Sequence, residues 1–411
     1  MSRLLQNNIR TIYLLGFFQS FMVVIPVFVP LLQGYGLSMS QVMQTQALFA
    51  LTIALFEVPS GYLADLWGRK RAILVGSALN SVGFLSLLWA DTFVDFLVYE
   101  FILGIGFSLI SGADLALLYD TEVYLADNDL PGGAGAGKSL SRLIAVEAAA
   151  SGVAGIAASV LLLLSMDAVI YVQALTGLVP AILGLMLVEA PRPTASAQNL
   201  DHRGNARRVM ELLLFGKPVV LWTAAAIAIF GLLAVYVFWI YQKYWEFQGI
   251  PVGLYGYIWA AFALTVSLAA RYASALEQRL GTRTILALIG GLPLLGLCGM
   301  ILGAGWFGVM FGFALQAARG LSMSLFYEAL NRRVPGDFRA TLNSLVSLGV
   351  RAVFIVTGPL LGVVLDAYGV KSTLLLMLVV FTPLIALVLV PLVMRIRREA
   401  DAEEPELAPA A

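Results

Sequence analysis

The sequence is poor in the side chains that most enzymes and metal sites require. Among its 411 residues are one histidine and one cysteine, and only 12% of the residues are charged. The single cysteine, Cys298, excludes an internal disulfide and argues against a thiolate metal site. The single histidine, His202, lies in a polar stretch, so no Ser-His-Asp arrangement forms within the apolar segments. We therefore predict no catalytic residues, no metal and no cofactor.

Charge of either sign is scarce, and the formal net charge is zero. A nucleic-acid partner calls for a basic surface, so we do not expect one. Apolar side chains fill the sequence instead and make up 60% of its residues, against about 45–50% in soluble domains. Such a chain would expose far more apolar surface than water tolerates. We therefore expect it to lie in a lipid bilayer.

A helix spans a bilayer with about 20 mostly apolar residues. The stretches that meet this requirement are 9–32, 40–63, 72–90, 94–118, 139–164, 167–188, 218–242, 253–276, 284–304, 306–329, 340–365 and 371–394. We therefore predict an all-α membrane protein with twelve transmembrane helices, called helices 1 to 12 below.

The distribution of lysine and arginine orients these helices. With an even number of spans both termini lie on one side, and the loops of that side carry nearly all the bases, including Arg69–Arg71 and Arg207–Arg208. The opposite loops hold only Lys243 and Lys371. Because basic loops stay in the cytoplasm, we expect a multi-pass protein of the cell (inner) membrane with both termini cytoplasmic.

The longest polar connection divides the chain into two halves of six helices. It covers residues 191–216 and contains Pro191 and Pro193. The short loops elsewhere and the lack of an extra domain favour a monomer. The predicted parts are an N-terminal bundle at 1–190, the linker at 191–216, a C-terminal bundle at 217–398 and a cytoplasmic tail at 399–411.

Two pairs of short matches indicate that the halves are related. Residues 112–121 (GADLALLYDT) match 320–329 (GLSMSLFYEA), and 66–73 (LWGRKRAI) match 279–286 (RLGTRTIL). Both members of each pair occupy the same place in their half. Self-similarity of this kind is the mark of an internal repeat, so we expect two pseudo-symmetric six-helix bundles.

The loop between helices 2 and 3 carries the most specific signal. It reads GYLADLWGRKRAIL at residues 61–74. This stretch resembles the signature G-x-L-A-D-R-x-G-R-K-x-x-x-L of the major facilitator superfamily and departs from it at Leu66. Residues 56–65 (FEVPSGYLAD) and 111–121 (SGADLALLYDT) are similar to a bacterial branch of that superfamily, whose members are uncharacterised or drug-exporter-like. The resemblance implies a transporter whose two bundles rock around a central site.

The resemblance also implies that this loop is a conformational latch that closes the cytoplasmic side. It places helix 2 beside helix 11, so that Asp65 lies near the N-terminus of helix 11, where a carboxylate gains about 0.3–1 kcal/mol. Arg69 would reach Asp120 at the end of helix 4. The alternative is that the bases only set the topology. The predicted latch residues are Gly61, Asp65, Gly68, Arg69, Lys70 and Asp120.

The charged residues inside predicted spans that carry the most information are Asp114, Glu147, Arg319 and Arg351. A charge at this depth costs at least about 2.5–3.5 kcal/mol, so each is a candidate functional residue. The resemblance implies that helices 1, 4, 7 and 10 line the cavity, which makes Asp114 and Arg319 face it. We expect Asp114 to carry the proton. For Glu147 and Arg351, a proton or substrate role and a pairing that holds the halves together remain equally open.

The pair Asp114 and Arg319 has two other interpretations. It is compatible with a static salt bridge, and with a site that holds both ends of a zwitterion. If Asp114 does not carry the proton, Glu147 is the next candidate. These alternatives stay open at the level of the sequence.

Aromatic residues concentrate on helix 7. Tyr236, Trp239 and Gln242 lie deeper in the span than the interfacial aromatics at 244–247, and we expect them to line the outer half of the cavity. Apolar walls with a few polar groups suit a small amphiphilic molecule.

The loop between helices 4 and 5 contains a literal match to a phosphate-binding loop, from Gly132 to Ser139. That motif acts only between a buried strand and a soluble helix. Here a polar stretch ending in Pro131 precedes it and a membrane span follows it. We therefore interpret it as a flexible linker that binds no nucleotide.

The combined prediction is a secondary transporter that exports a small amphiphilic molecule by alternating access, driven by the proton gradient. Proton-coupled or facilitated uptake of a small metabolite is the alternative, and a lipid translocase is another. A Gly-Pro motif that exporters often carry in helix 5 is absent there and appears in helix 11, at 357–362. A receptor or scaffold would not need charges inside its spans.

Overall fold

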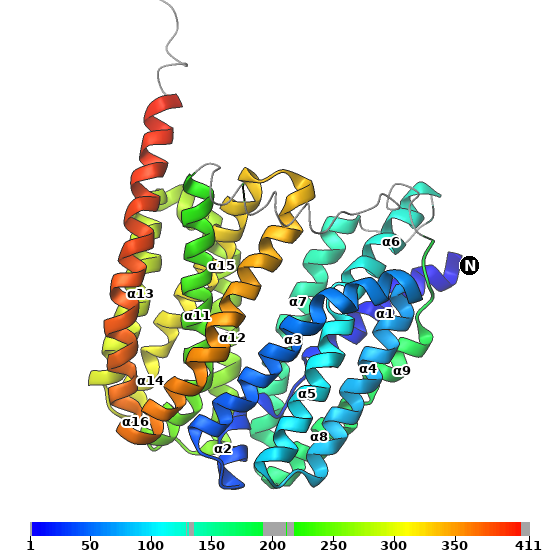
Figure 1. The fold of residues 1–411 in the computed structure, drawn as a ribbon, viewed down its shortest axis with the longest axis horizontal. Coiled ribbons are helices and arrows are strands. Elements are labelled where there is room, and N and C mark those ends of the chain that lie inside the picture. The colour runs from blue at the N-terminus through cyan, green and yellow to red at the C-terminus, as the bar shows by residue number, and fades with distance from the viewer. Residues whose placement is uncertain (1, 129, 131–134, 192–210, 212–217, 404–411) are drawn as a thin grey trace, which may run out of the picture. The chain divides into compact units, whose positions relative to one another are not determined.

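The computed structural model describes residues 2–128, 130, 135–191, 211 and 218–403. All the regular structure in these ranges is helical (Figure 1). Eleven helical segments of the described chain are long and apolar enough to cross a membrane. The predicted all-α membrane class is therefore confirmed.

In the first half, three of the spans each consist of consecutive shorter helices. Helix 1 comprises α1, the 3₁₀ turn η1 and α2, helix 4 comprises α5 and α6, and helix 6 comprises α8 and α9. The elements are α1 (Ser2–Ser20), η1 (Ile25–Val27), α2 (Phe28–Gly34), α3 (Met39–Trp67), α4 (Arg69–Ser86), η2 (Leu87–Trp89), α5 (Phe93–Ile110), α6 (Ala113–Asp127), α7 (Ala136–Leu161), α8 (Met166–Thr176) and α9 (Val179–Met186).

The second half ends in one very long helical element. Its elements are α11 (Pro218–Phe247), η4 (Val252–Leu254), α12 (Tyr255–Leu280), α13 (Thr282–Leu302), α14 (Gly305–Met310), α15 (Gly312–Arg333) and α16 (Gly336–Glu403). The apolar segment of α16, Thr341–Ile396, has 56 residues, which is about 84 Å at 1.5 Å per residue, far more than the bilayer's roughly 30 Å.

A non-helical residue explains this length. Gly369 has φ 77° and ψ 177°, and divides α16 into two helices. Positive φ is readily adopted only by glycine. The two resulting helices correspond to the predicted helices 11 and 12, so the eleven long segments of the described chain agree with twelve passes.

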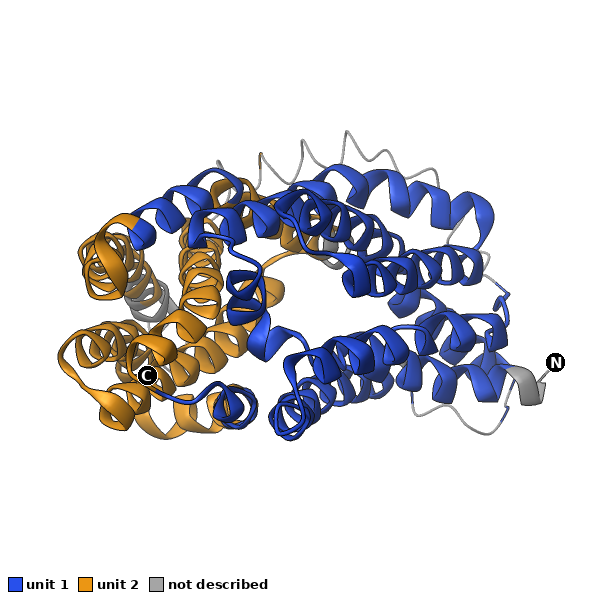
Figure 2. Ribbon diagram, turned by 90° about the horizontal axis from the view of Figure 1, so that it is seen from below, with its two compact units in different colours: residues 1–198, 250–263, 355–366 blue, residues 199–249, 264–354, 367–411 orange. Residues whose placement is uncertain are grey.

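The chain folds into two compact units, each described by itself (Figure 2). Most of the predicted linker (192–210 and 212–216), residue 217 of the predicted C-terminal bundle and the end of the predicted tail (404–411) lie outside the described residues. Unit 1 includes two short segments of the second half. Unit 1 is Met1–Gln198, Ile250–Ala263 and Ile355–Asp366; unit 2 is Asn199–Gly249, Leu264–Phe354 and Ala367–Ala411.

The core of unit 1 shows why α1 packs as it does. Leu5, Ile9, Ile12 and Leu15 recur at intervals of three and four residues and are all buried. This spacing forms one face of a helix. That face joins a cluster with apolar residues of α6, α7 and α9, and so holds the helices that carry the charged residues of this unit.

Small residues let other helices of unit 1 approach closely. A Cβ on Gly76 of α4 would lie 2.7 Å from the carbonyl oxygen of Gly106 on α5, and a Cβ on Gly104 would lie 2.7 Å from the Cβ of Thr52 on α3. Such contacts between backbones are a main source of helix association in a bilayer.

Candidate functional site

The 61–74 loop is a tight connection built around Gly68. This residue separates α3 from α4 with φ 98° and ψ 148°, and a Cβ on it would lie 2.9 Å from Oε2 of Glu189. The Glu189 carboxylate accepts hydrogen bonds from the backbone N–H groups of Arg69 (2.9 Å) and Lys70 (2.8 Å). Glu189 therefore caps the N-terminus of α4, where a negative charge is stabilised.

The structure brings Arg69 and Asp120 together, the contact that the sequence predicts. The Arg69 guanidinium forms an ion pair with the buried Asp120 of α6 and donates a second hydrogen bond to the carbonyl oxygen of Ala116, at 2.7 Å. A buried ion pair is stable only when further hydrogen bonds satisfy its groups. Here Ala116 provides one of them, so the loop is fixed to helix 4.

Two other predicted latch residues lie at the surface of unit 1. Asp65 is exposed, and no atom lies within 4 Å of a Cβ placed on Gly61. The N-terminus of helix 11 belongs to unit 2, which is described separately. The role of Asp65 at that terminus stays a prediction.

The opposite ends of the same helices do meet within unit 1. Asp366 of α16 accepts hydrogen bonds from the backbone N–H groups of Met39 (2.9 Å) and Ser40 (2.8 Å) at the start of α3. A Cβ on Gly362 would lie 2.6 Å from the Cα of Ser40. A carboxylate of helix 11 thus caps the N-terminus of helix 2, on the side of the protein opposite the 61–74 loop.

Helices 5 and 8 meet on that same side. A Cβ on Gly256 would lie 1.9 Å from the carbonyl oxygen of Gly155, so the two backbones touch. The N–H of Tyr257 donates to Oγ of Ser159, at 3.1 Å. The pairing of helix 2 with helix 11 is the one implied by the family resemblance.

Asp114 and Glu147 form an acidic pair in unit 1. Asp114 is buried in the first turn of α6, and its Oδ1 accepts from the N–H of Leu115, at 2.7 Å. Glu147 of α7 is partly buried and interacts electrostatically with Asp114. A Cβ on Gly16 of α1 would lie 3.4 Å from Oε1 of Glu147. In the described part of the chain, no base forms an ion pair with either acid.

Helix 4 is interrupted just before Asp114. α5 ends at Ile110, Gly112 adopts φ 84°, and α6 starts at Ala113. The N-terminus of α6 therefore lies inside the span and points its N–H groups at the Asp114 carboxylate. Interrupted helices with inward-facing termini mark substrate and ion sites in transporters.

Helix 1 is interrupted as well. α1 ends at Ser20, η1 starts at Ile25, and the N–H of Val24 donates to Oε1 of Gln173 on α8, at 3.3 Å. Next to the break, the rings of Phe17 and Phe21 stack with centroids 5.7 Å apart. Irregular backbone at membrane depth is tolerated only inside protein or beside a water-filled cavity. Neither break was predicted from the sequence, although Pro26 and Gly112 were available as signals.

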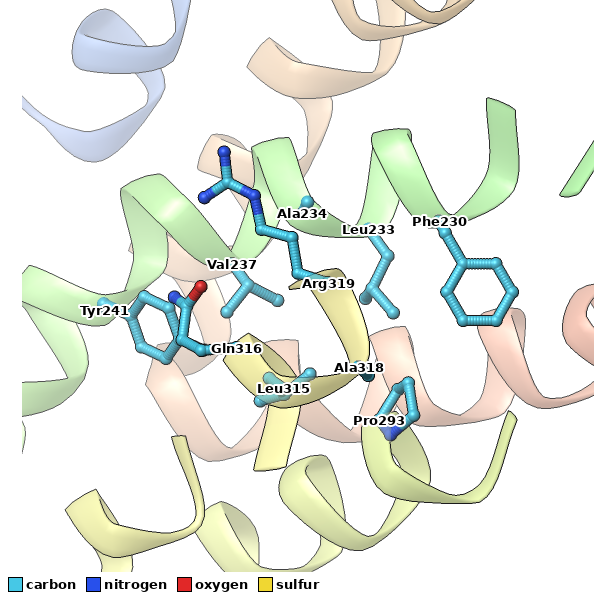
Figure 3. A pocket seen from close by; sticks show the side chains of 10 residues that line it. All are labelled: Phe230, Leu233, Ala234, Val237, Tyr241, Pro293, Leu315, Gln316, Ala318 and Arg319. Carbon is cyan, nitrogen blue, oxygen red and sulfur yellow. The ribbon is translucent and has the colours of Figure 1, made fainter. Parts of the chain in front are cut away.

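Unit 2 contains a recess between α11, α13 and α15 (Figure 3). The space that it encloses is small, about 20 Å³. Residues at positions 230, 233, 234, 237 and 241 of α11 line one wall. Arg319 and Gln316 of α15 line another and are its only charged or amide side chains among the described residues.

The predicted aromatic set of helix 7 does not line this recess. Tyr236 packs in the core of unit 2 against Phe354 and Phe381, with centroids 5.9 and 6.1 Å away. Trp239 and Gln242 are also buried. The recess is instead lined by a neighbouring face of α11, and Tyr241 is the last residue of α11 that lines it.

The two predicted bases have different surroundings. Arg319 lies in the recess, and Arg351 is partly buried on α16. Both belong to unit 2, whereas Asp114 and Glu147 belong to unit 1. The predicted pairings of Asp114 with Arg319 and of Glu147 with Arg351 therefore stay predictions.

The glycine-rich loop is held by a carboxylate where phosphate would have to bind. Buried Glu122 of α6 accepts from Oγ of Ser139 and from the N–H of Gly135, the latter at 3.1 Å. The start of the loop, residues 132–134, lies outside the described residues. A membrane span, α7, follows the loop. An acid at this position repels phosphate oxygens, which supports the interpretation as a linker.

Comparisons with known proteins identify a family from the sequence and similar folds among solved structures. A sequence model described as Major Facilitator Superfamily matches residues 11–315. Three similar solved structures are a nucleoside transporter, a bacterial homolog to a human lysosomal transporter and a proton symporter. A mutant form of nucleoside transporter NupG has a TM-score of 0.75 and 11% identity, and the match covers 95% of this chain and 99% of that chain. The Spinster homolog in an inward-facing, unoccupied conformation has a TM-score of 0.71 and 15% identity, with 96% and 97% of the two chains covered. D-xylose-proton symporter has a TM-score of 0.65 and 14% identity, with 91% and 95% covered.

The linker interpretation makes a prediction about stability and nucleotide binding. Glu122→Ala leaves the Gly135 N–H and the Ser139 hydroxyl without their acceptor, which costs about 1–3 kcal/mol. We expect a lower thermal unfolding midpoint of the purified protein in detergent. Lys138→Ala, at an exposed position of the same loop, is the matched control and should unfold like the wild type. Stabilisation of the wild type by ATP that disappears in Lys138→Ala would contradict the linker interpretation.

Proposed function

Because the chain belongs to the major facilitator superfamily it is a membrane transporter, and we propose that it couples transport of a small amphiphilic molecule to protons through the Asp114–Glu147 pair. The proton gradient is its energy source, the cell membrane its location and the cytoplasm the side of both termini. The observation that carries the proposal is the position of the two acids: buried Asp114 lies at the interruption of helix 4, and Glu147 lies on α7, which packs against α6. Neither acid forms an ion pair with a base among the described residues.

The surroundings of the two acids favour different protonation states. Asp114 accepts a backbone N–H at the N-terminus of α6, and both the hydrogen bond and the helix dipole favour its ionised form. Two neighbouring carboxylates repel each other when both are ionised, and one bound proton removes that repulsion. In place of the sequence expectation that Asp114 carries the proton, we therefore propose that Asp114 holds the negative charge and that Glu147 carries the exchangeable proton.

Alternating access requires that the pair meets each aqueous phase in turn. We propose that the Asp366 contact with the start of α3 is the gate on one side, and that the latch around Asp65 is the gate on the other. In this proposal each gate uses a carboxylate at a helix N-terminus: Asp366 at the start of α3, and Asp65 at the start of helix 11, where the sequence predicts it. Breaking one contact while making the other would expose the pair alternately.

For direction, we propose export, as the similarity to the drug-exporter-like branch suggests. Uptake by proton symport is the second candidate, because a D-xylose-proton symporter shares the fold and helix 5 lacks the exporters' Gly-Pro motif. Transport into liposomes with a pH gradient imposed in either direction separates the two.

The proton role of the acidic pair is tested by neutralising each acid. Glu147→Gln should abolish substrate accumulation driven by a pH gradient in proteoliposomes, because the pair loses its exchangeable proton. Substrate exchange without a gradient should continue. Asp114→Asn should also abolish coupling, since it removes the charge that makes protonation of the pair favourable.

Glu100→Gln is the matched control for this test. Glu100 is another buried acid of helix 4, and it accepts from Nε2 of Gln46 rather than facing the pair. Its variant should retain coupling. Normal accumulation in the double variant of Asp114 and Glu147 would sink the proposal.

The gate proposal is tested by labelling from the two sides. A single cysteine at Ser20, in a Cys298→Ser background, reports access to the break in helix 1. Asp366→Asn removes one of two acceptors from the start of α3, at a cost of about 0.5–1.5 kcal/mol. Labelling by an impermeant maleimide from the side opposite the 61–74 loop should rise about two- to tenfold.

Asp65→Asn should change labelling in the reverse direction, because it weakens the other gate. The exposed Asp91, on the same side as Asp366, is the control, and Asp91→Asn should have no effect. Unchanged labelling in Asp366→Asn would show that this contact is no gate.

A further inference from the structure

Helix 1 contacts the acidic pair at a residue that has no side chain. Gly16 is buried on α1, one turn before this helix ends at Ser20. A Cβ on Gly16 would lie 2.6 Å from Cδ1 of Leu143 and 3.4 Å from Oε1 of Glu147, both on α7. The space that a side chain at position 16 would need is therefore filled by these two side chains of α7.

The packing around Leu143 makes the position of Glu147 sensitive to residue 16. Leu143 is completely buried and belongs to a core cluster to which α1, α6 and α7 all contribute. Because protein interiors are closely packed, Leu143 has little room in which to avoid a new methyl group. Glu147 follows four residues later, and residues four apart are neighbours on a helix surface. A side chain at position 16 would therefore displace both residues.

One charged group interacts with Glu147 among the described residues. The elements packed against α7 are α1, α6, α8, η1 and η4. Asp114 of α6 interacts with Glu147 electrostatically. The other charged side chains that the structure describes on these elements and on α7 itself do not, namely Arg10, Asp120, Glu122, Asp127, Lys138, Arg142 and Asp167. Within unit 1, Asp114 and the backbone of α1 are thus the surroundings that bear most directly on the Glu147 carboxyl group.

We propose that Gly16 is a positioning residue of the acidic pair: its bare backbone leaves the space that the Glu147 side chain occupies, and so fixes where the carboxyl group exchanges its proton. A glutamate side chain loses rotamer freedom when it is held in one place, and the wall formed by α1 at Gly16 provides that restraint. The assignment rests on the proposed function, in which Glu147 carries the proton. It also makes Glu147 sensitive to movement of α1 at its break, which follows Ser20.

Serine and alanine at position 16 test the contact in different ways. Both introduce a Cβ, but serine adds a hydroxyl group that reaches hydrogen-bonding range of Glu147 Oε1 from a Cβ 3.4 Å away. A hydrogen bond to the carboxylate favours its ionised form, whereas alanine adds only an apolar methyl group. We expect labelling of the protonated acid to reach its half-maximum at a pH about one unit lower in Gly16→Ser than in Gly16→Ala, which is a tenfold shift.

The measurement uses the full-length protein in nanodiscs and does not require transport. Dicyclohexylcarbodiimide labels carboxyl groups in their protonated form, and mass spectrometry of the peptide that contains Glu147 gives the extent of labelling at each pH. Gly152→Ala and Gly152→Ser are the matched controls, because Gly152 lies on α7 and no atom lies within 4 Å of a Cβ placed on it. Both controls should titrate like the wild type. Gradient-driven accumulation in proteoliposomes should show the same order of pH midpoints.

A second set of variants makes room for the new side chain. Leu143→Val removes the Cδ1 atom that a Cβ at position 16 would meet first. Gly16→Ala and Gly16→Ser, each combined with Leu143→Val, should therefore fold even if the single variants do not. The difference in pH midpoint between serine and alanine should remain, since the serine hydroxyl keeps its access to Oε1.

Two results would overturn the assignment. Equal midpoints in the serine and alanine variants would show that position 16 does not contact the Glu147 carboxyl group. An equally large difference between the two Gly152 variants would assign the effect to helix propensity rather than to the contact.

The positioning role and the proton role can fail separately. If Glu147→Gln retains coupling, the proton role fails, while labelling of Glu147 in the position-16 variants still reports the contact with Gly16. If Glu147→Gln abolishes coupling and the position-16 variants have equal midpoints, the proton role stands and Gly16 is excluded as a positioning residue.

Discussion

The need to satisfy every backbone polar group inside a bilayer shapes this protein more than any other constraint. Water is absent from hydrocarbon, so a helix can be interrupted only where protein groups replace the lost hydrogen bonds. In helix 1, Gln173 accepts from the backbone of Val24. In helix 4, Asp114 accepts from Leu115. The acid proposed to hold the negative charge is thus also a structural substitute for a missing backbone acceptor.

The same use of carboxylates recurs at the helix ends. Glu189 caps α4 and Asp366 caps α3, while Glu122 holds the start of α7 through Gly135 and Ser139. Glu189 and Asp366 each accept from two N–H groups at a helix N-terminus, and Glu122 accepts from one N–H and one hydroxyl. A negative charge is favoured at such a terminus. Carboxylates at helix N-termini therefore connect several helices of this chain to one another.

The sequence was informative where the signal is local. Apolar length predicted the spans, and a motif at fixed spacing predicted the contact of Arg69 with Asp120. It did not reveal Glu189 or Asp366, because the groups they cap lie about 120 and 327 residues away along the chain. The break in helix 1 was missed because residues 21–27 are apolar and continue the span, although Pro26 among them is a signal for a break. On helix 7, aromatic content did not distinguish Tyr236, which packs in the core, from Tyr241, which lines the recess.

The contact between Gly155 and Gly256 differs in kind from the one made by Asp366. At the glycines two backbones touch, and one hydrogen bond, from the N–H of Tyr257 to Oγ of Ser159, joins the same two helices. At Asp366 two hydrogen bonds must break before the segments part. The first contact therefore depends mainly on close packing, and the second depends on hydrogen bonds that hold the two segments together. A side chain introduced at Gly256 would therefore force the two helices apart, whereas a change at Asp366 would remove hydrogen bonds between helices 2 and 11.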